Sequence, residues 1–252
     1  HDALLELGQE IDKHKKCNEN QKELLDTELQ KLLQYYYSGK YKTVVNETTS
    51  LIKTHPQSSS LLKIKGVSCF KLERYEEALE CYKYLNEIEP NSSETFFAIG
   101  NIYQNQKKMD SAEDYYNQSL KLNPEYSEAY NNLGVIYKEK RDFELAIKCY
   151  KKAISLNKNY FDAYYNTGVT YQKKRELDQA KKYLLHAVKL QPAAVGALYE
   201  LGKVLYQSGE LFASKETYVK ALNISPNNQK IKLSFCELLK AYNPDGSSGE
   251  HA

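Results

Sequence analysis

The sequence predicts an all-α protein made of stacked helix pairs, and three observations predict it. The first is a series of glycines spaced by 34 residues: Gly66, Gly100, Gly134, Gly168 and Gly202. The second is a series of prolines with the same step and one omission: Pro56, Pro90, Pro124, Pro192 and Pro226. The third is that apolar residues recur at helical spacing twice within each 34-residue interval. Because one helix pair cannot bury its apolar side alone, we expect the pairs to stack.

The residues ahead of the first repeat, 1–24, are expected to form an N-terminal helix or extension. Leu4, Leu7 and Ile11 have helical spacing, whereas the following segment is too polar to be buried. The chain begins with His1, and Met109 is its single methionine. These features favour a processed protein or a piece of a longer one.

Six repeats are expected, at 25–58, 59–92, 93–126, 127–160, 161–194 and 195–228. In 127–160, Tyr130, Leu133 and Tyr137 share one stripe, and the chain breaks at Arg141 before a second amphipathic segment. Glycine and alanine are expected where the two helices of a pair approach closely. The first repeat is degenerate, because Leu32 takes the place of the glycine.

The residues after the repeats predict an end to the stack. Residues 229–242 carry Ile231, Phe235 and Leu238 on one stripe with charged residues elsewhere, which predicts a capping helix. Residues 243–252 contain two glycines, two serines and one proline, and we expect a flexible tail.

The repeat pattern resembles the tetratricopeptide-repeat family. That family places an aromatic residue, Leu-Gly, Tyr, Ala, an aromatic residue and Pro at fixed positions in 34 residues. Residues 93–126 provide these positions in order as Phe96, Ile99-Gly100, Tyr103, Ala112, Tyr116 and Pro124. The resemblance implies a right-handed superhelical solenoid in which the first helix of each pair lines a concave groove. It further implies a protein–protein interaction scaffold that binds an extended peptide or a partner protein there.

Carried over by position, the resemblance assigns these groove residues: Phe97, Asn101, Asn131, Val135, Lys138, Asp162, Tyr165, Val169, Tyr199, Lys203 and Tyr206. Amides can hold a peptide backbone, and aromatic faces can seat its side chains. The alternative for Tyr165, Tyr199 and Tyr206 is that they only pack the repeats together.

A finer resemblance concerns Asn132 and Asn166, which both stand two positions before the repeat glycine. The superhelical arms of protein O-GlcNAc transferase-like proteins grip a bound backbone with asparagines at this position. The other repeats depart from the pattern with Ile64, Ala98 and Glu200. The carboxylate clamp of chaperone-binding modules is disfavoured, because its cationic positions hold Phe97, Asp162 and Asn166.

Basic residues gather where the first helices are expected to end: Lys107-Lys108, Lys138, Lys140-Arg141 and Lys173-Lys174-Arg175. Favourable interaction with the negative end of a helix dipole explains each group separately. The alternative is a basic rim that steers an acidic partner.

Composition and motifs exclude several classes of function. The 35 basic and 33 acidic residues leave a net charge of +2, so we expect no nucleic-acid binding, and no apolar run is long enough for a membrane span. Five widely spaced cysteines favour a cytoplasmic or nuclear protein. We find no catalytic motif and expect no enzyme, metal or cofactor. Two alternatives stay open: a substrate-recruiting arm of a larger enzyme such as a protein glycosyltransferase, and a self-associating assembly subunit.

Overall fold

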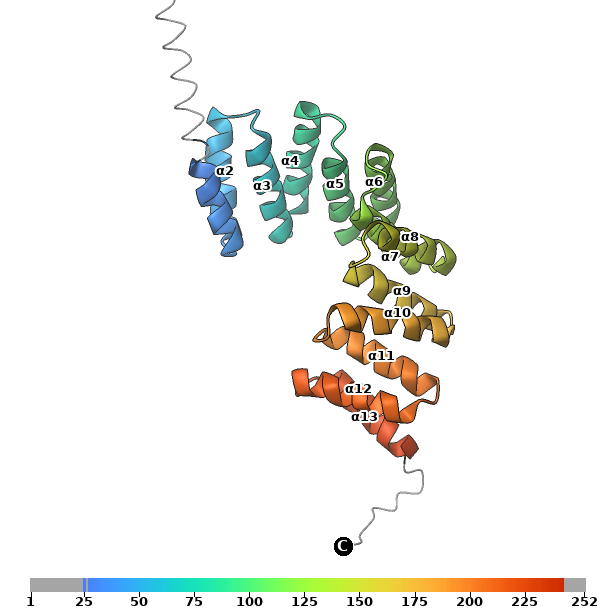
Figure 1. Ribbon diagram of the computed structural model, residues 1–252. Coiled ribbons are helices and arrows are strands. Elements are labelled where there is room, and N and C mark those ends of the chain that lie inside the picture. Colours follow the sequence, from blue (N-terminus) through green and yellow to red (C-terminus); the bar gives the residue numbers. More distant parts are fainter. Residues whose placement is uncertain (1–24, 26, 243–252) are drawn as a thin grey trace, which may run out of the picture. The chain divides into compact units, whose positions relative to one another are not determined.

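The computed structural model describes residue 25 and residues 27–242 (Figure 1). The extension predicted at 1–24 and the tail predicted at 243–252 lie outside the described residues. The contacts divide the chain into two compact units. Unit 1 ends at Tyr115 and unit 2 begins at Tyr116, inside one helix, and each unit is described by itself.

Unit 1 consists of helix pairs that pack in sequence order. Its helices lie at residues 27–37, α2 Tyr41–Thr54, α3 Ser59–Lys71, α4 Tyr75–Ile88, α5 Ser93–Asn105 and the first half of α6 Met109–Leu122. Helix α3 packs against both α2 and α4, and α4 packs against α5. The core between them includes Leu62, Cys69, Tyr82 and Ile99.

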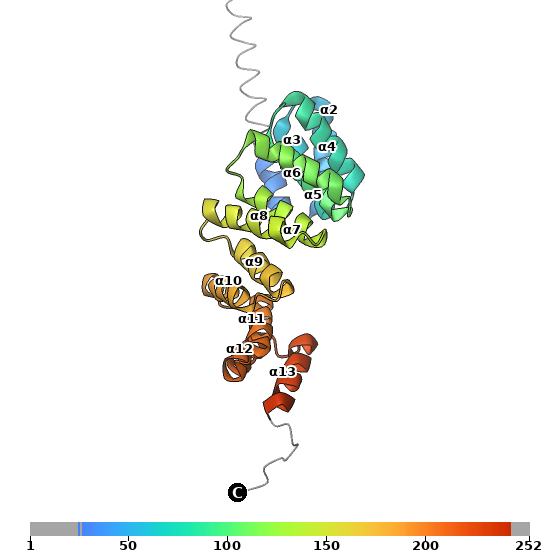
Figure 2. The same ribbon diagram turned by 90° about the vertical axis from the view of Figure 1, so that its right-hand side faces the viewer.

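Unit 2 begins with the second half of α6 and is likewise built of helix pairs. Its helices are α7 Ser127–Glu139, α8 Phe143–Leu156, α9 Phe161–Lys173, α10 Leu177–Leu190, α11 Val195–Gln207, α12 Leu211–Ile224 and α13 Gln229–Tyr242. Figures 1 and 2 show the pairs α9–α10 and α11–α12 stacked in succession. The first helices also contact one another, α7 with α9, α9 with α11 and α11 with α13. They therefore share one side of unit 2, which we call its first-helix face.

The described residues contain helices and no strands, which confirms the predicted all-α stack of helix pairs. The repeat glycines lie where the two helices of a pair touch. A Cβ atom on Gly134 would lie 2.5 Å from the ring of Tyr150, and one on Gly202 would lie 2.6 Å from the ring of Tyr218. Both tyrosines are fully buried. The glycine series thus marks close contact within each pair.

The turn between the two helices of a pair repeats one backbone conformation. Six residues spaced by 34 have positive φ: Gly39, Glu73, Lys107, Arg141, Arg175 and Gly209. Each stands two residues after the last residue of the first helix of its pair. The backbone N–H of the next residue donates to a carbonyl in the last turn of that helix, as Lys108 N does to Tyr103 O at 2.9 Å. A left-handed residue at this place is the common way to end a helix, and glycine adopts it without steric cost.

This turn predicts opposite effects for two substitutions. Lys107→Gly relieves a left-handed non-glycine residue and should raise the free energy of unfolding by about 0.5–1 kcal/mol. Gly209→Lys introduces the same strain and should lower it by a similar amount. Chemical denaturation of both variants checks the prediction. A loss of stability in Lys107→Gly would show that the Lys107 side chain matters more than its backbone conformation.

Candidate peptide-binding surfaces

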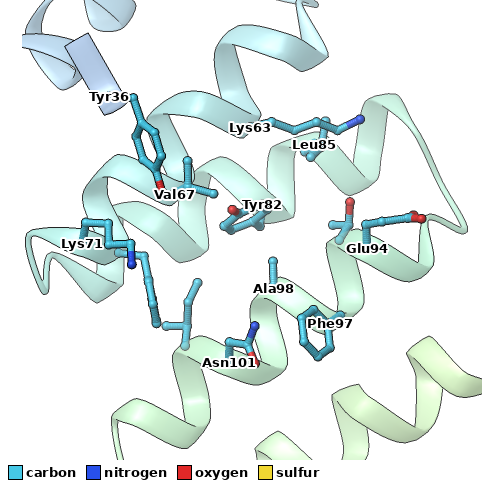
Figure 3. Close-up of a pocket in the computed structure, with 13 residues that line it drawn as sticks. Tyr36, Lys63, Val67, Lys71, Tyr82, Leu85, Glu94, Phe97, Ala98 and Asn101 are labelled. Carbon is cyan, nitrogen blue, oxygen red and sulfur yellow. The ribbon is translucent and has the colours of Figure 1, made fainter. Parts of the chain in front are cut away.

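A groove in unit 1 lies between its first helices. It has a volume of about 370 Å³. Figure 3 shows the labelled side chains around it, with Tyr82 in their midst. The lining comes from the helix at 27–37, α3, α4 and α5: Tyr36, Lys63, Val67, Phe70, Lys71, Tyr82, Leu85, Glu94, Thr95, Phe97, Ala98, Asn101 and Ile102. We call it the unit 1 pocket.

The unit 1 pocket combines an apolar interior with charged edges. Tyr82, Leu85 and Ile102 are buried and contribute apolar surface, and burial raises the pKa of the Tyr82 hydroxyl. Lys63 and Lys71 are exposed. Lys63 Nζ donates to Glu89 Oε2 at 2.9 Å. Such a pocket can bury an apolar side chain while its rim interacts with polar neighbours.

Two of the predicted groove residues, Phe97 and Asn101, line this pocket from α5. The prediction missed Lys63 and Val67, which line it from α3. The sequence contained the signal, because these residues stand 34 positions before Phe97 and Asn101. Applying the same repeat register to the second repeat would have found both.

In unit 2, the structure brings three predicted asparagines together on the first-helix face. Asn166 Nδ2 of α9 donates to Asn131 Oδ1 of α7 at 3.1 Å. Asn131 Nδ2 donates to Asn132 Oδ1 at 3.2 Å, and Asn132 Nδ2 donates to the Tyr116 hydroxyl at 3.3 Å. We call Asn131, Asn132 and Asn166 the asparagine cluster. Each amide has two N–H donors and an oxygen that can accept, so it offers both kinds of hydrogen-bonding group that a peptide backbone needs.

The asparagine cluster is only partly accessible. Asn131 is buried, whereas Asn132 and Asn166 are half-buried. Tyr165, beside Asn166 on α9, is half-buried, and its ring stacks on Phe161 with 6.1 Å between centroids. Burial raises the pKa of the Tyr165 hydroxyl, and the nearby Glu200 carboxylate adds to this effect.

The predicted residues of α11 lie next to the capping helix α13. Tyr199 is only 9% exposed, and Lys230 Nζ of α13 lies 4.6 Å from the centre of its ring. The Tyr199 hydroxyl is 3.5 Å from Ser234 Oγ. Lys203 Nζ donates to Glu200 Oε2 at 2.9 Å, and Tyr206 is half-buried. Tyr199 is therefore a packing residue that contacts α12 through Tyr218 and α13 through Lys230 and Ser234.

Lys138 lines a different pocket, near the ends of α7 and α9. The pocket has a volume of about 290 Å³, and its lining consists of Lys138, Glu139, Arg141, Phe143 and Lys173. We call it the basic pocket. Burial lowers the pKa of Lys138; Glu139 opposes this effect, and the positive charge of Lys173 adds to it.

No group of three or more His, Cys, Asp or Glu side chains within the described residues converges as a metal site would require. None of the helices described has the length and hydrophobicity needed to traverse a bilayer.

Sequence profiles described as tetratricopeptide repeat match residues 93–126, 127–160, 149–182 and 195–228. No curated protein sequence matches the chain. Many solved structures share the fold. The crystal structure of YrrB, described as a TPR protein with an unusual peptide-binding site, is 19% identical with a TM-score of 0.58, covering 74% of this chain and 96% of that chain.

Two further structures give the same result. MamA from Desulfovibrio magneticus RS-1 is 20% identical with a TM-score of 0.60, covering 68% of this chain and 97% of that chain. A chain of the APC/C hetero-tetramer Cut9-Hcn1 is 18% identical with a TM-score of 0.71, covering 81% of this chain and 41% of that chain. These similarities concern the fold. Together with the profile matches and the helix pairs described above, they show that the chain carries tetratricopeptide repeats and folds as an all-α tetratricopeptide-repeat solenoid.

Proposed function

We propose that this chain is a binding scaffold whose unit 1 pocket holds an apolar side chain of an extended peptide from a partner protein. The observation that carries the proposal is that successive first helices, α3 and α5, line one groove of about 370 Å³. Tetratricopeptide repeats commonly serve as protein-interaction scaffolds, and the description of YrrB names a peptide-binding site. The lining of the pocket suits this function, because peptide-binding sites bury apolar anchors at their centre.

The asparagine cluster supports a second contact, to peptide backbone. An amide can donate to a carbonyl and accept from an N–H, so it pairs with a peptide group of any sequence. Asn132 and Asn166 are half-buried and lie 34 residues apart on α7 and α9. Their bonds to Asn131 and Tyr116 hold these side chains in place. We expect a bound backbone to hydrogen-bond to the amide groups of Asn132 and Asn166.

Selection from a library of unstructured peptides, followed by affinity measurements, tests the proposal. Ala98→Leu fills the pocket and should raise the Kd of selected peptides tenfold or more, about 1.4 kcal/mol. Ala241→Leu, the same change at an exposed site of α13, should leave the Kd unchanged. Circular dichroism of both variants establishes that the fold is kept. Equal affinity of Ala98→Leu and the unaltered protein would exclude the unit 1 pocket.

The double variant Asn132→Ala/Asn166→Ala tests the backbone contact separately. We expect it to weaken peptide binding by about tenfold or more, because amide hydrogen bonds to the ligand are lost. Peptides whose affinity changes with Ala98→Leu but not with this variant would restrict binding to unit 1.

A second candidate is a substrate-recruiting arm of a larger enzyme, such as a protein glycosyltransferase. The observation that favours it is the equivalent placement of Asn132 and Asn166, which resembles the arms of protein O-GlcNAc transferase-like proteins. The coding sequence of the parent gene decides this point. A catalytic domain in the same reading frame would support the arm, and a gene that encodes only the repeats would refute it.

A third candidate is self-association. The observation that favours it is the exposed apolar surface near the end of the stack, where Phe212 and Leu233 are each 66% exposed. Light scattering over a range of protein concentrations distinguishes the cases. A mass that rises with concentration indicates an assembly subunit, and a constant mass of one chain indicates a monomeric scaffold.

A further inference from the structure

The basic pocket of unit 2 contains an unusually placed lysine. The side chain of Lys138 is only 14% exposed, and its salt bridge is a long one, 3.9 Å from Nζ to Oε1 of the adjacent Glu139. A buried ammonium group is unfavourable unless it is closely paired. The Glu139 side chain is itself 56% exposed, so its carboxylate only weakly offsets the cost of burying the Lys138 charge. The burial of Lys138 is therefore not explained by its protein contacts.

Two more cations face the same pocket. Arg141 stands in the left-handed turn after α7, and Lys173 ends α9. Within the described part of the chain, neither forms a salt bridge. The three cations and the single carboxylate of Glu139 leave the pocket with an excess of two positive charges.

The next repeat shows that the fold does not require these charges. Gln172 and Gln207 occupy the places of Lys138 and Lys173 one repeat later, because each is 34 residues further along. There the two side chains bond directly, with Gln172 Nε2 donating to Gln207 Oε1 at 3.1 Å. The same junction is thus satisfied by two neutral amides. The two lysines at the equivalent place between α7 and α9 are therefore not needed for packing, and binding of a negatively charged ligand would explain them.

We propose that the basic pocket binds a phosphate monoester group, as carried by a phosphorylated side chain of a partner protein. A phosphate monoester has a charge of about −1.5 to −2 at pH 7, which matches the excess of positive charge. Arg141 can donate two parallel hydrogen bonds to such a group, and the lysines add point charges. Phe143 provides an apolar wall for the carbon atoms next to the phosphate. This site is separate from the unit 1 pocket and from the asparagine cluster.

Nuclear magnetic resonance titration of the full chain tests the proposal. The probes are a blocked tripeptide Ala-phosphoserine-Ala, the same peptide with serine or glutamate, and inorganic phosphate. We expect the phosphopeptide to shift the backbone amide signals of residues 138–143 and 173. We expect the glutamate peptide to bind about tenfold more weakly, because it carries one charge and two oxygens. Inorganic phosphate should shift the same signals, since the phosphate group is the part recognised.

The variant Lys138→Gln/Lys173→Gln reproduces the amide pair of the next repeat. It should fold with an unchanged or higher melting temperature, because it removes a buried charge and a repulsion between like charges. It should also raise the Kd of the phosphopeptide tenfold or more. Lys174→Met is the matched control: Lys174 is a neighbouring lysine that is already paired with Glu144 and Glu176. Its phosphopeptide affinity should be unchanged.

Several results would overturn the proposal. One is unchanged phosphopeptide affinity in Lys138→Gln/Lys173→Gln. Another is equal binding of the glutamate and phosphoserine peptides, which would show that phosphate is not selected. A third is tighter binding of a thymidine oligonucleotide through the same amide signals, which would identify a phosphodiester site instead. A lower melting temperature in the double glutamine variant would show that the lysines have a structural role.

Discussion

Gly134→Ala is expected to destabilise the protein by about 2 kcal/mol. The new methyl carbon would lie 2.5 Å from the Tyr150 ring, well inside van der Waals contact. Tyr150 is fully buried, so its ring can move only by displacing other core residues. The intrinsic preference of helices for alanine offsets about 1 kcal/mol of this cost. Chemical denaturation followed by circular dichroism measures the change.

Gly196→Ala is the matched control for this substitution. Gly196 also lies in a first helix, α11, but the nearest atom to an added Cβ is the Tyr165 hydroxyl at 3.9 Å. Without a clash, only the helix preference remains, and the free energy of unfolding should rise by about 0.5–1 kcal/mol. If both variants change stability by the same amount and in the same direction, close packing is not the reason for the glycine at 134.

Tyr218→Ala is expected to lower the free energy of unfolding by about 3–5 kcal/mol, the usual range for removing a large buried aromatic ring. The Tyr218 side chain is 1% exposed, and its ring contacts Gly202, Tyr199 and Phe235. The ring thus joins α11, α12 and α13 into one core. Because each repeat contacts only its neighbours, we expect the loss to be concentrated in the last repeat.

Hydrogen exchange locates the effect of Tyr218→Ala. Amides of α11, α12 and α13 should lose protection, while those of α3 and α4 in unit 1 should keep it. Phe212→Ala, on the same helix, removes a side chain that is 66% exposed and should change stability by less than about 0.5 kcal/mol. Uniform loss of protection along the whole chain would contradict the expectation that the repeats unfold separately.

The helix pairs could be predicted from the sequence because the physical constraint that produces them recurs every 34 residues. Gly134 and Gly202 are glycine because a facing tyrosine leaves no room for a side chain, and such a requirement is visible as a spacing. The left-handed residue after each first helix is less visible. Arg141 and Lys107 adopt the same conformation as Gly39, and their side chains give no sign of it. Only alignment by repeat reveals this turn.

The candidate sites were harder to predict, because position in the repeat does not determine what a side chain contacts. Tyr165 and Tyr199 occupy equivalent positions, yet α13 covers Tyr199 and leaves it 9% exposed. Asn131 was predicted as a groove residue and is buried between Asn132 and Asn166. Lys138 was predicted as a groove residue, and the structure places it in the lining of the basic pocket. In each case the exposure and contacts of the side chain depend on which residues the neighbouring repeat places against it. The repeat register of a single residue does not contain that information.

The regular turn also defines how such a chain can change length. Residues 39, 73, 107, 141, 175 and 209 share one conformation at intervals of 34 residues. If 34 residues are deleted or duplicated, every left-handed residue keeps its place after a first helix. This holds wherever in the repeat the deletion or duplication begins. A deletion of any other length puts a helix residue into the left-handed position and shifts every later apolar stripe. Gene duplication in whole repeats is thus the mode of evolution that this architecture permits, and new binding surfaces can arise by editing a copied repeat while the others preserve the fold.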